Sequence, residues 1–160
     1  MVNQKVVAVD TEILIWGIQK RGANEDKYKQ AEYFLTKYIK DNELLLLIPT
    51  IVVGEYLVKV TTNEEEIFNT FLENCIVVDY DLPAARIAAK IWALRKATNL
   101  QITSTRFCIN ADCKIIATAK AHGAEVLYTE NKDMEKLAKL IDYPTKRLPE
   151  IPPQQGQLFF

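Results

Sequence analysis

The chain has 160 residues, of which 49% are hydrophobic and 26% are charged, as is ordinary for a globular domain with its own core. Its 20 Lys and Arg residues and 21 Asp and Glu residues leave a formal net charge of −1, which excludes the overall positive field of a strongly basic nucleic-acid-binding protein. Any contact with nucleic acid must therefore depend on a local patch of positive charge.

Cysteine usage and hydropathy indicate the cellular setting. Cys75, Cys108 and Cys113 form no Cys-x-x-Cys pair, which favours buried or surface thiols in a reduced, intracellular protein over a zinc site or a disulfide framework. The longest apolar run, residues 44–53, is too short to cross a bilayer, and the first residues lack the pattern of a signal peptide. We therefore expect a cytoplasmic protein without membrane contact.

Strands and helices are predicted to alternate along the chain. Continuous apolar runs, typical of strands buried on both faces, span residues 5–9, 44–48, 75–78 and 125–128. Apolar spacing of three and four residues, together with capping residues, predicts helices that begin at residues 11, 24, 50, 63, 81, 112 and 133. Residues 99–110 are polar and are expected to form a loop.

This alternation predicts a single α/β domain, with a mostly parallel central sheet of four to five strands and helices on both faces. We expect the domain to comprise residues 1–143. Residues 144–160 are rich in proline and form a C-terminal tail. The apolar end of the tail, Leu158 to Phe160, is expected to dock on this chain, on a second copy in a homodimer, or on another partner.

Polar residues stand at positions where core residues would be expected. Asp10 ends the first predicted strand, and Glu55 interrupts the apolar side of the helix that follows the second. Asp112 shares a helix face with Ile115 and Ile116. Three further polar residues follow the fourth predicted strand: Thr129, Asn131 and Asp133. Because ligands of parallel α/β sheets bind beyond the carboxyl ends of the strands, these side chains are expected to converge at one edge.

Converging carboxylates need a counter-charge, because they repel one another and burial raises their pKa values. A set of hard oxygen ligands without histidine or thiolate selects Mg²⁺ or Mn²⁺ rather than Zn²⁺. Such an ion coordinates phosphate oxygens and activates water for attack on phosphorus.

Each position also has a simpler interpretation. Asp10 and Asp112 can cap or start helices, Glu55 can be solvated if its helix is rotated, and Asn131 is an ordinary turn and cap residue. The joint interpretation as one site is favoured because independent caps need not all fall at one sheet edge.

The polar residues lie in three stretches, which read VAVDTEILIW from Val7, IPTIVVGEYL from Ile48 and DCKIIATAKAHGAEVLYTENKDMEKLA from Asp112. From residue 5 to about residue 140 the chain resembles the PIN domain, including the VapC-like toxins of bacterial toxin–antitoxin systems. The resemblance implies a Mg²⁺- or Mn²⁺-dependent nuclease with an RNA substrate. If the protein is a toxin, it further implies a small antitoxin protein as partner.

The resemblance also implies roles for individual residues. Asp10, Glu55 and Asp112 match the acidic positions of the family, and Asn131 stands where a fourth acidic residue is usual; these four are the implied catalytic and metal-binding residues. Asp133 is a further implied metal ligand. The implied supporting residues are Thr11, from the first motif, and Thr129, whose hydroxyl orients metal-bound water.

Two departures from the family pattern bear on activity. Asn131 lowers the negative charge of the site, which implies a weaker second metal site or a single-metal mechanism. Glu12 replaces a small polar residue and either points away or restores part of that charge. Arg106, Lys114 and Lys132 flank the proposed site and can neutralise phosphates, although each also fits a solvated helix face.

The sequence therefore predicts a metal-dependent endoribonuclease, either the toxin of a toxin–antitoxin pair or a stand-alone enzyme. A catalytically weak PIN-fold module that binds RNA or protein is the alternative, which Asn131 and the acidic pI of about 5.9 favour. A phosphatase or phosphoacceptor is disfavoured, because the run from Asp10 to Glu12 contains no second aspartate.

Overall fold

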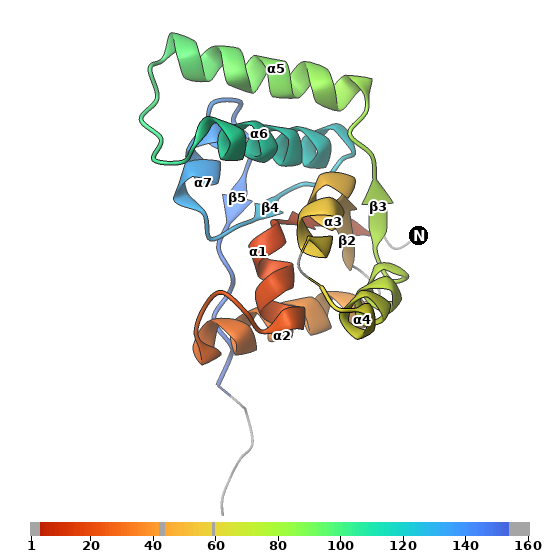
Figure 1. Ribbon diagram of the computed structural model, residues 1–160. Coiled ribbons are helices and arrows are strands. Elements are labelled where there is room, and N and C mark those ends of the chain that lie inside the picture. The colour runs from red at the N-terminus through yellow and green to blue at the C-terminus, as the bar shows by residue number, and fades with distance from the viewer. Residues whose placement is uncertain (1–3, 42–43, 59, 154–160) are drawn as a thin grey trace, which may run out of the picture.

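A computed structural model describes residues 4–41, 44–58 and 60–153 as one α/β domain (Figure 1). Five strands form a wholly parallel sheet in the order β3-β2-β1-β4-β5, so the predicted fold class is confirmed. The strands are β1 (Lys5–Val9), β2 (Leu44–Pro49), β3 (Ile76–Val78), β4 (Leu127–Tyr128) and β5 (Thr145–Lys146). The helices are α1 (Thr11–Leu14), the π-helical turn η1 (Ile15–Gln19), α2 (Glu25–Lys40), α3 (Thr50–Leu57), α4 (Thr62–Leu72), α5 (Leu82–Ala97), α6 (Arg106–Ala121) and α7 (Lys132–Lys139).

The order of the strands reverses between β1 and β4. The chain moves outward from β1 through β2 to β3 and then returns through α5 and α6 to place β4 on the other side of β1. β1 and β4 lie in register, with Val9 opposite Tyr128. In parallel α/β sheets, ligands bind beyond the carboxyl ends of the strands at such a reversal, and we refer to this edge of the sheet as the crevice.

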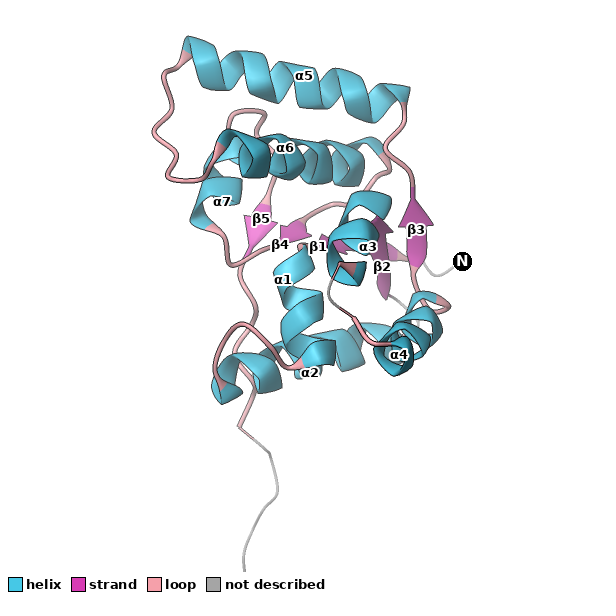
Figure 2. Ribbon diagram, viewed as in Figure 1, coloured by secondary structure: helices cyan, strands magenta, loops and turns pink. Residues whose placement is uncertain are grey.

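Helices cover both faces of the sheet, as Figure 2 shows. The helices α5 and α6 lie on one side, and α2 and α4 lie on the other. Val7, Ala8 and Val9 of β1 are all buried, as expected for a strand covered on both faces. On the α4 side, the rings of Tyr56 and Phe68 stack with centroids 3.8 Å apart.

Helix α6 begins at Arg106, so the prediction of a loop through residue 110 and a helix start at Asp112 was wrong. Thr105 caps the helix, its Oγ1 accepting a hydrogen bond from the Cys108 amide at 3.3 Å. The first turn was missed because only Ile109 is buried there, so it shows no apolar periodicity. Asp112 is therefore an internal residue of the helix, and the alternative of a cap or first-turn carboxylate does not hold.

Two other details of the helices also differ from prediction. The capping box of α4 pairs Thr61 with Glu64, so the helix begins before the predicted start at residue 63. In α3 the buried residues are Val52 and Tyr56, whereas Glu55, predicted to lie on the apolar side of this helix, is exposed. Tyr56 sets the rotation of α3 because its large ring fills the core.

The segment after residue 143 joins the sheet. Thr145 and Lys146 pair with β4, and Leu148 is buried. The side chain of Gln30 donates hydrogen bonds to the carbonyls of Leu148 and Pro149, at 3.2 and 2.9 Å. The sheet therefore extends beyond the boundary that the proline content predicts, while Leu158 to Phe160 lie outside the described residues. Among the helices of the described chain, none is long and apolar enough to span a bilayer.

Candidate active site

Asp10 lies at the carboxyl end of β1 and is only 5% exposed. Its Oδ1 accepts a hydrogen bond from the Thr11 amide at 2.7 Å, so it caps α1, as the simpler interpretation predicts. Its Oδ2 accepts a hydrogen bond from Thr129 Oγ1 at 3.0 Å. The carboxylate is thus held by the chain that follows β1 and by the chain that follows β4.

Thr129 links the elements of the crevice. It is fully buried, and its hydroxyl donates to Asp10 and accepts a hydrogen bond from the Asn131 amide at 3.0 Å. Its own amide donates to the Lys146 carbonyl in β5 at 2.9 Å. The position of the hydroxyl is therefore fixed by the sheet, which suits the supporting role expected for Thr129.

Replacing Thr129 by valine is expected to lower the free energy of unfolding by about 1–3 kcal/mol, because a buried carboxylate and a backbone amide each lose a hydrogen-bond partner. Urea denaturation measures the change. Thr118→Val is the matched control, since this equally buried hydroxyl donates only to the Lys114 carbonyl within its own helix. Equal losses for the two variants would contradict the linking role of Thr129.

Glu55 reaches the site through a threonine. Thr11, which is 5% exposed, donates a hydrogen bond from Oγ1 to Glu55 Oε2 at 2.7 Å and so joins α1 to α3. Glu55 itself is exposed, as in the interpretation with a rotated helix, yet this contact holds its carboxylate at the edge that carries Asp10. Thr11 therefore orients Glu55.

Asp112 is buried without a hydrogen-bond partner for one of its oxygens. The side chain is 9% exposed, and Oδ2 makes no hydrogen bond with any described residue. Burial, followed by the charges of Asp10 and Glu55, raises its pKa to about 8. The residues predicted as acidic ligands are thus close enough to repel one another.

Asp10 experiences the same crowding. Burial and the charge of Glu12 raise its pKa to about 7, although the hydrogen bonds from Thr11 and Thr129 act in the opposite direction. Burial and the charges of Glu130 and Glu55 also raise the pKa of Glu12. Glu12 therefore adds negative charge to this edge of the sheet.

Asn131 is the N-cap of α7. Its Oδ1 accepts hydrogen bonds from the amides of Asp133 and Met134, at 2.9 and 3.4 Å. The cap role that the sequence left open for Asn131 is therefore present. Its amide oxygen is directed at the start of α7.

Asp133 anchors the loop between α5 and α6. Its Oδ2 accepts hydrogen bonds from Thr103 Oγ1, the Ser104 amide and Ser104 Oγ, at 2.9, 3.0 and 2.6 Å. Burial acts to raise the pKa of Asp133, but these hydrogen bonds outweigh it and hold the pKa below the ordinary value. The polar loop is thus held against α7 at this point.

Asp133→Ala is expected to lower the free energy of unfolding by about 2 kcal/mol at neutral pH, because several donors lose their acceptor. Since the pKa of Asp133 is lowered, its contribution is present above the pKa of the unfolded chain and is lost as pH falls through the folded value. Urea denaturation as a function of pH measures this. Glu135→Ala, which removes only an exposed ion pair with Arg147, is the control and is expected to cost less than about 1 kcal/mol. An equal cost for both would contradict the anchor.

The crevice contains further groups that sequence reasoning missed. Glu130 lies between Thr129 and Asn131, contacts Lys27 of α2 as an ion pair, and has a buried Oε2 without a hydrogen bond to any described residue. Its position directly after β4 could have identified it as a site residue, because Thr129 and Asn131 are predicted from that same position. Lys27, on a distant helix, offered no comparable signal.

The cations predicted to bind substrate do not gather around the carboxylates. The Arg106 guanidinium lies 5.7 Å from the ring centroid of Trp92, and Lys114 Nζ lies 5.6 Å from that of Tyr80. Arg106 therefore points toward α5 and Lys114 toward the connection between β3 and α5, while Lys132 is exposed at the first position of α7.

The donor set of the crevice fits a hard divalent cation. It consists of carboxylate oxygens, one of them unpartnered on Asp112, whose pKa values are raised by burial and by mutual repulsion. Within the described residues, no three acidic, histidine or cysteine side chains form a ready-made cation cage. Mg²⁺ does not need one, because it keeps several waters and binds one or two carboxylates.

Comparison with known proteins locates this fold among characterised structures. The structure of VapBC2 from Rickettsia felis bound to promoter DNA matches with a TM-score of 0.63 at 17% identity, over 90% of this chain and 99% of that one. DNA-bound VapBC from Salmonella typhimurium matches with a TM-score of 0.63 at 18% identity, over 91% and 99%. FitAcB from Neisseria gonorrhoeae matches with a TM-score of 0.61 at 18% identity, over 87% and 95%.

At these identities the structures show a shared fold. No curated protein matches the sequence. The sequence model of the PIN domain matches residues 7–140, a span that contains Asp10, Glu55, Asp112 and the turn after β4. The resemblance seen in the sequence is thus confirmed, and the chain belongs to the PIN domain family.

Proposed function

We propose that this protein is a metal-dependent endoribonuclease that hydrolyses RNA phosphodiester bonds. The observation that carries the proposal is the buried, unpartnered carboxylate oxygen of Asp112, which shares the crevice with Asp10 and Glu55. Burying several carboxylates together destabilises the folded protein unless the site binds a cation. Membership of the PIN family supports the proposal, because PIN domains are generally nucleases that use divalent metals.

The residues of such a site have different roles, some binding the cation and others orienting its ligands. Asp10, Glu55 and Asp112 would hold Mg²⁺ or Mn²⁺, which when bound polarises the phosphate and lowers the pKa of a water molecule. Thr129 fixes Asp10, and Thr11 fixes Glu55, so two ligands are oriented before the cation binds.

The remaining predicted residues take secondary roles. Asn131 and Asp133 are proposed to bind at the outer side of the cation. Asn131 would do so through its position beside Thr129, and Asp133 through the carboxylate oxygen that accepts no hydrogen bond from the loop. Arg106, Lys114 and Lys132 are proposed to contact RNA phosphates away from the reacting bond.

The proposal also includes protein partners. Similarity to VapBC and FitAcB complexes supports a toxin that pairs with a small antitoxin protein in the cytoplasm, and a second copy of the chain is a further proposed partner. The cap role of Asn131 favours a second candidate function, a PIN-fold module that binds RNA or protein but cleaves poorly.

Cleavage of an end-labelled single-stranded RNA in Mg²⁺ or Mn²⁺ separates these functions. The wild-type chain is expected to release RNA fragments. Asp10→Asn and Glu55→Gln are expected to slow this release by at least about 100-fold, because even the residues that support metal ligands contribute 10–100-fold to metal affinity or activity. Asp26→Asn, at an exposed position of α2, is the control and should cleave normally. Absence of cleavage of any RNA or single-stranded DNA with either metal would favour the binding module.

A further inference from the structure

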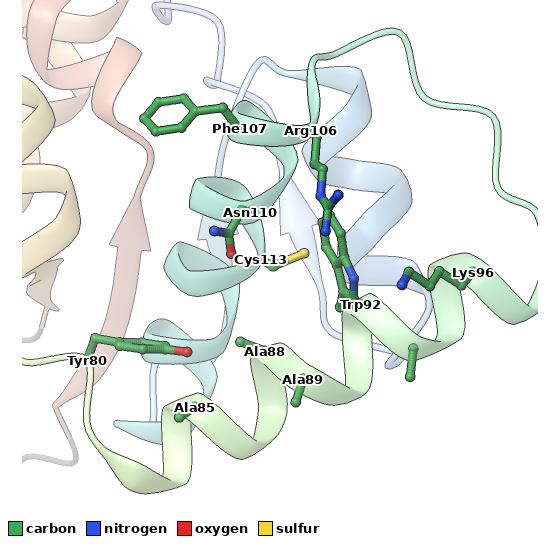
Figure 3. A pocket seen from close by; sticks show the side chains of 11 residues that line it. Tyr80, Ala85, Ala88, Ala89, Trp92, Lys96, Arg106, Phe107, Asn110 and Cys113 are labelled. Carbon is green, nitrogen blue, oxygen red and sulfur yellow. The ribbon is translucent and has the colours of Figure 1, made fainter.

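A groove of about 730 Å³ runs between α5 and α6, and the carboxylates of the crevice do not line it (Figure 3). Alanine side chains of α5 leave the space, because Ala85, Ala88 and Ala89 have no bulk beyond Cβ. Tyr80 lies near one end of the groove and Trp92 near the other. The groove is thus a separate surface feature, bounded by an aromatic ring at each end.

Positive charges gather at both ends of this groove. Around the Trp92 ring centroid lie Arg95 Cζ at 4.5 Å, Arg106 Cζ at 5.7 Å and Lys96 Nζ at 5.9 Å. At the other end, Lys114 Nζ lies 5.6 Å from the Tyr80 ring centroid. Unlike the surface lysines and arginines that pair with glutamates elsewhere, none of these cations forms an ion pair within the described residues.

One of these cations is also short of a hydrogen-bond acceptor. Arg95 Nε is buried and makes no hydrogen bond with any described residue. Leaving a buried donor without a partner is costly, and a bound anion would remove that cost. The aromatic rings hold the charged groups in place beforehand, so less side-chain entropy is lost when the anion binds.

The surface beside the groove favours nucleic acid over an acidic peptide as the anion. Phe107 follows Arg106 in α6 and is 83% exposed, and Figure 3 shows its ring extending outward from α6 on the side away from the Arg106 side chain. Single-stranded nucleic acids are held by cations that contact the backbone and by aromatic rings on which bases stack. Unpaired cations beside an exposed ring match that combination.

The groove is within reach of the carboxylate site. Arg106 and Asp112 are separated by about 9 Å along the axis of α6, at 1.5 Å per residue. Asp112 faces the sheet and Arg106 faces α5, so an RNA that contacts both must cross the exposed surface of α6. Phe107 lies on that surface.

We propose that the groove between α5 and α6 is a docking site for single-stranded RNA, which holds the strand several nucleotides away from the bond cleaved beside Asp112. Arg95, Lys96 and Arg106 bind phosphates, and Phe107 stacks on a base. The inference rests on the proposed nuclease function, because it supplies the substrate grip for that site.

Fluorescence anisotropy with a labelled, unstructured 20-nucleotide RNA tests the docking site, with Asp112→Asn as the background so that the probe stays intact. Adding Lys96→Gln and Arg106→Gln is expected to weaken binding by about tenfold or more and to reduce the slope of log K against log salt by about 1.4, at about 0.7 per phosphate contact. Adding Phe107→Ala should also weaken binding about tenfold, with an unchanged salt slope.

The control replaces cations on the exposed face of the same helix. Arg86→Gln with Lys90→Gln removes the same charge from α5 outside the groove and should leave affinity and slope unchanged. The side chains replaced in the groove and control variants are all exposed, and thermal unfolding confirms that each variant folds. Equal weakening by the control pair, no weakening by the groove variants, or equal competition by a poly-glutamate peptide would overturn the docking site.

Cleavage assays distinguish a failure of the docking site from a failure of the nuclease proposal. Groove variants in an otherwise wild-type chain should raise KM for the 20-nucleotide RNA by about tenfold and leave kcat within about twofold. If the chain binds RNA in the groove and cleaves nothing, the nuclease proposal fails alone. If it cleaves and the groove variants keep the wild-type KM, the docking site fails alone.

Discussion

Asp112→Asn is expected to stabilise the metal-free protein at pH 8 while abolishing cleavage. The substitution keeps the shape of the side chain and removes a charge that burial and neighbouring carboxylates disfavour, as the raised pKa of about 8 indicates. At 1.36 kcal/mol per pKa unit, and allowing for relaxation of the site, we expect a gain of about 2–4 kcal/mol in the free energy of unfolding. For a chain of this size that corresponds to a rise in Tm of about 5–10 °C.

The sign of the effect depends on pH. In the folded protein Asp112 keeps its proton up to a pKa of about 8, whereas an unfolded aspartate loses it near 3.8. The folded state therefore binds more protons between these values, so the free energy of unfolding falls as pH rises from about 4 to about 8. The variant should match the wild type below pH 4 and exceed it increasingly up to pH 8.

Urea denaturation in EDTA across this pH range measures the difference. Glu125→Gln changes an exposed carboxylate, 58% accessible in its pair with Lys5, and is expected to leave the pH profile unaltered. Parallel profiles for wild type and Asp112→Asn would mean that Asp112 ionises freely in the folded protein. The repulsion between buried carboxylates, from which the cation site is inferred, would then be absent.

Mg²⁺ or Mn²⁺ is expected to stabilise the wild-type protein and to stabilise it more at pH 8 than at pH 5.5. A ligand that binds only the folded state at 100 times its Kd adds about 2.7 kcal/mol, or about 5–10 °C in Tm. At pH 5.5 protons compete for Asp10 and Asp112, whose pKa values are raised to about 7 and about 8.

Thermal unfolding against metal concentration, at constant ionic strength, tests this coupling. Asp10→Asn and Asp112→Asn should lose most of the metal-dependent shift, whereas Asp26→Asn on the exposed side of α2 should retain it. An equal shift in all variants would place the cation elsewhere on the protein.

Much of the site could be predicted because it depends on local sequence patterns. The apolar run of β1 ends at Asp10, and the parallel arrangement that the alternating elements require carries this residue to the same edge as the turn after β4. Asp112 was selected because it shares a helix face with core residues, and its burial confirms that placement.

Other features depend on packing that the sequence does not express. The first turn of α6 was missed because the side chains of Arg106, Phe107 and Cys108 are exposed and leave no apolar period. The rotation of α3 follows from Tyr56 fitting the core, so Glu55 reaches Asp10 through Thr11 and not from an inward face.

The cation cluster around Trp92 lay beyond sequence prediction for a related reason. Arg95 and Lys96 come from the end of α5, whereas Arg106 comes from the start of α6, and their shared contact exists only because the two helices pack together. Likewise, Glu130 gains its partner Lys27 from α2, far away in the chain.

Anomalous diffraction from crystals soaked in Mn²⁺ at pH 8 tests the central claim most directly. We predict an anomalous peak at the carboxyl ends of β1 and β4, from a Mn²⁺ ion that Asp10 and Asp112 bind directly or through its waters. The peak should be absent from Asp112→Asn crystals. A saturating soak that gives no peak in this crevice, or the same peak in the variant, would contradict the assignment of these carboxylates as the metal site of a nuclease.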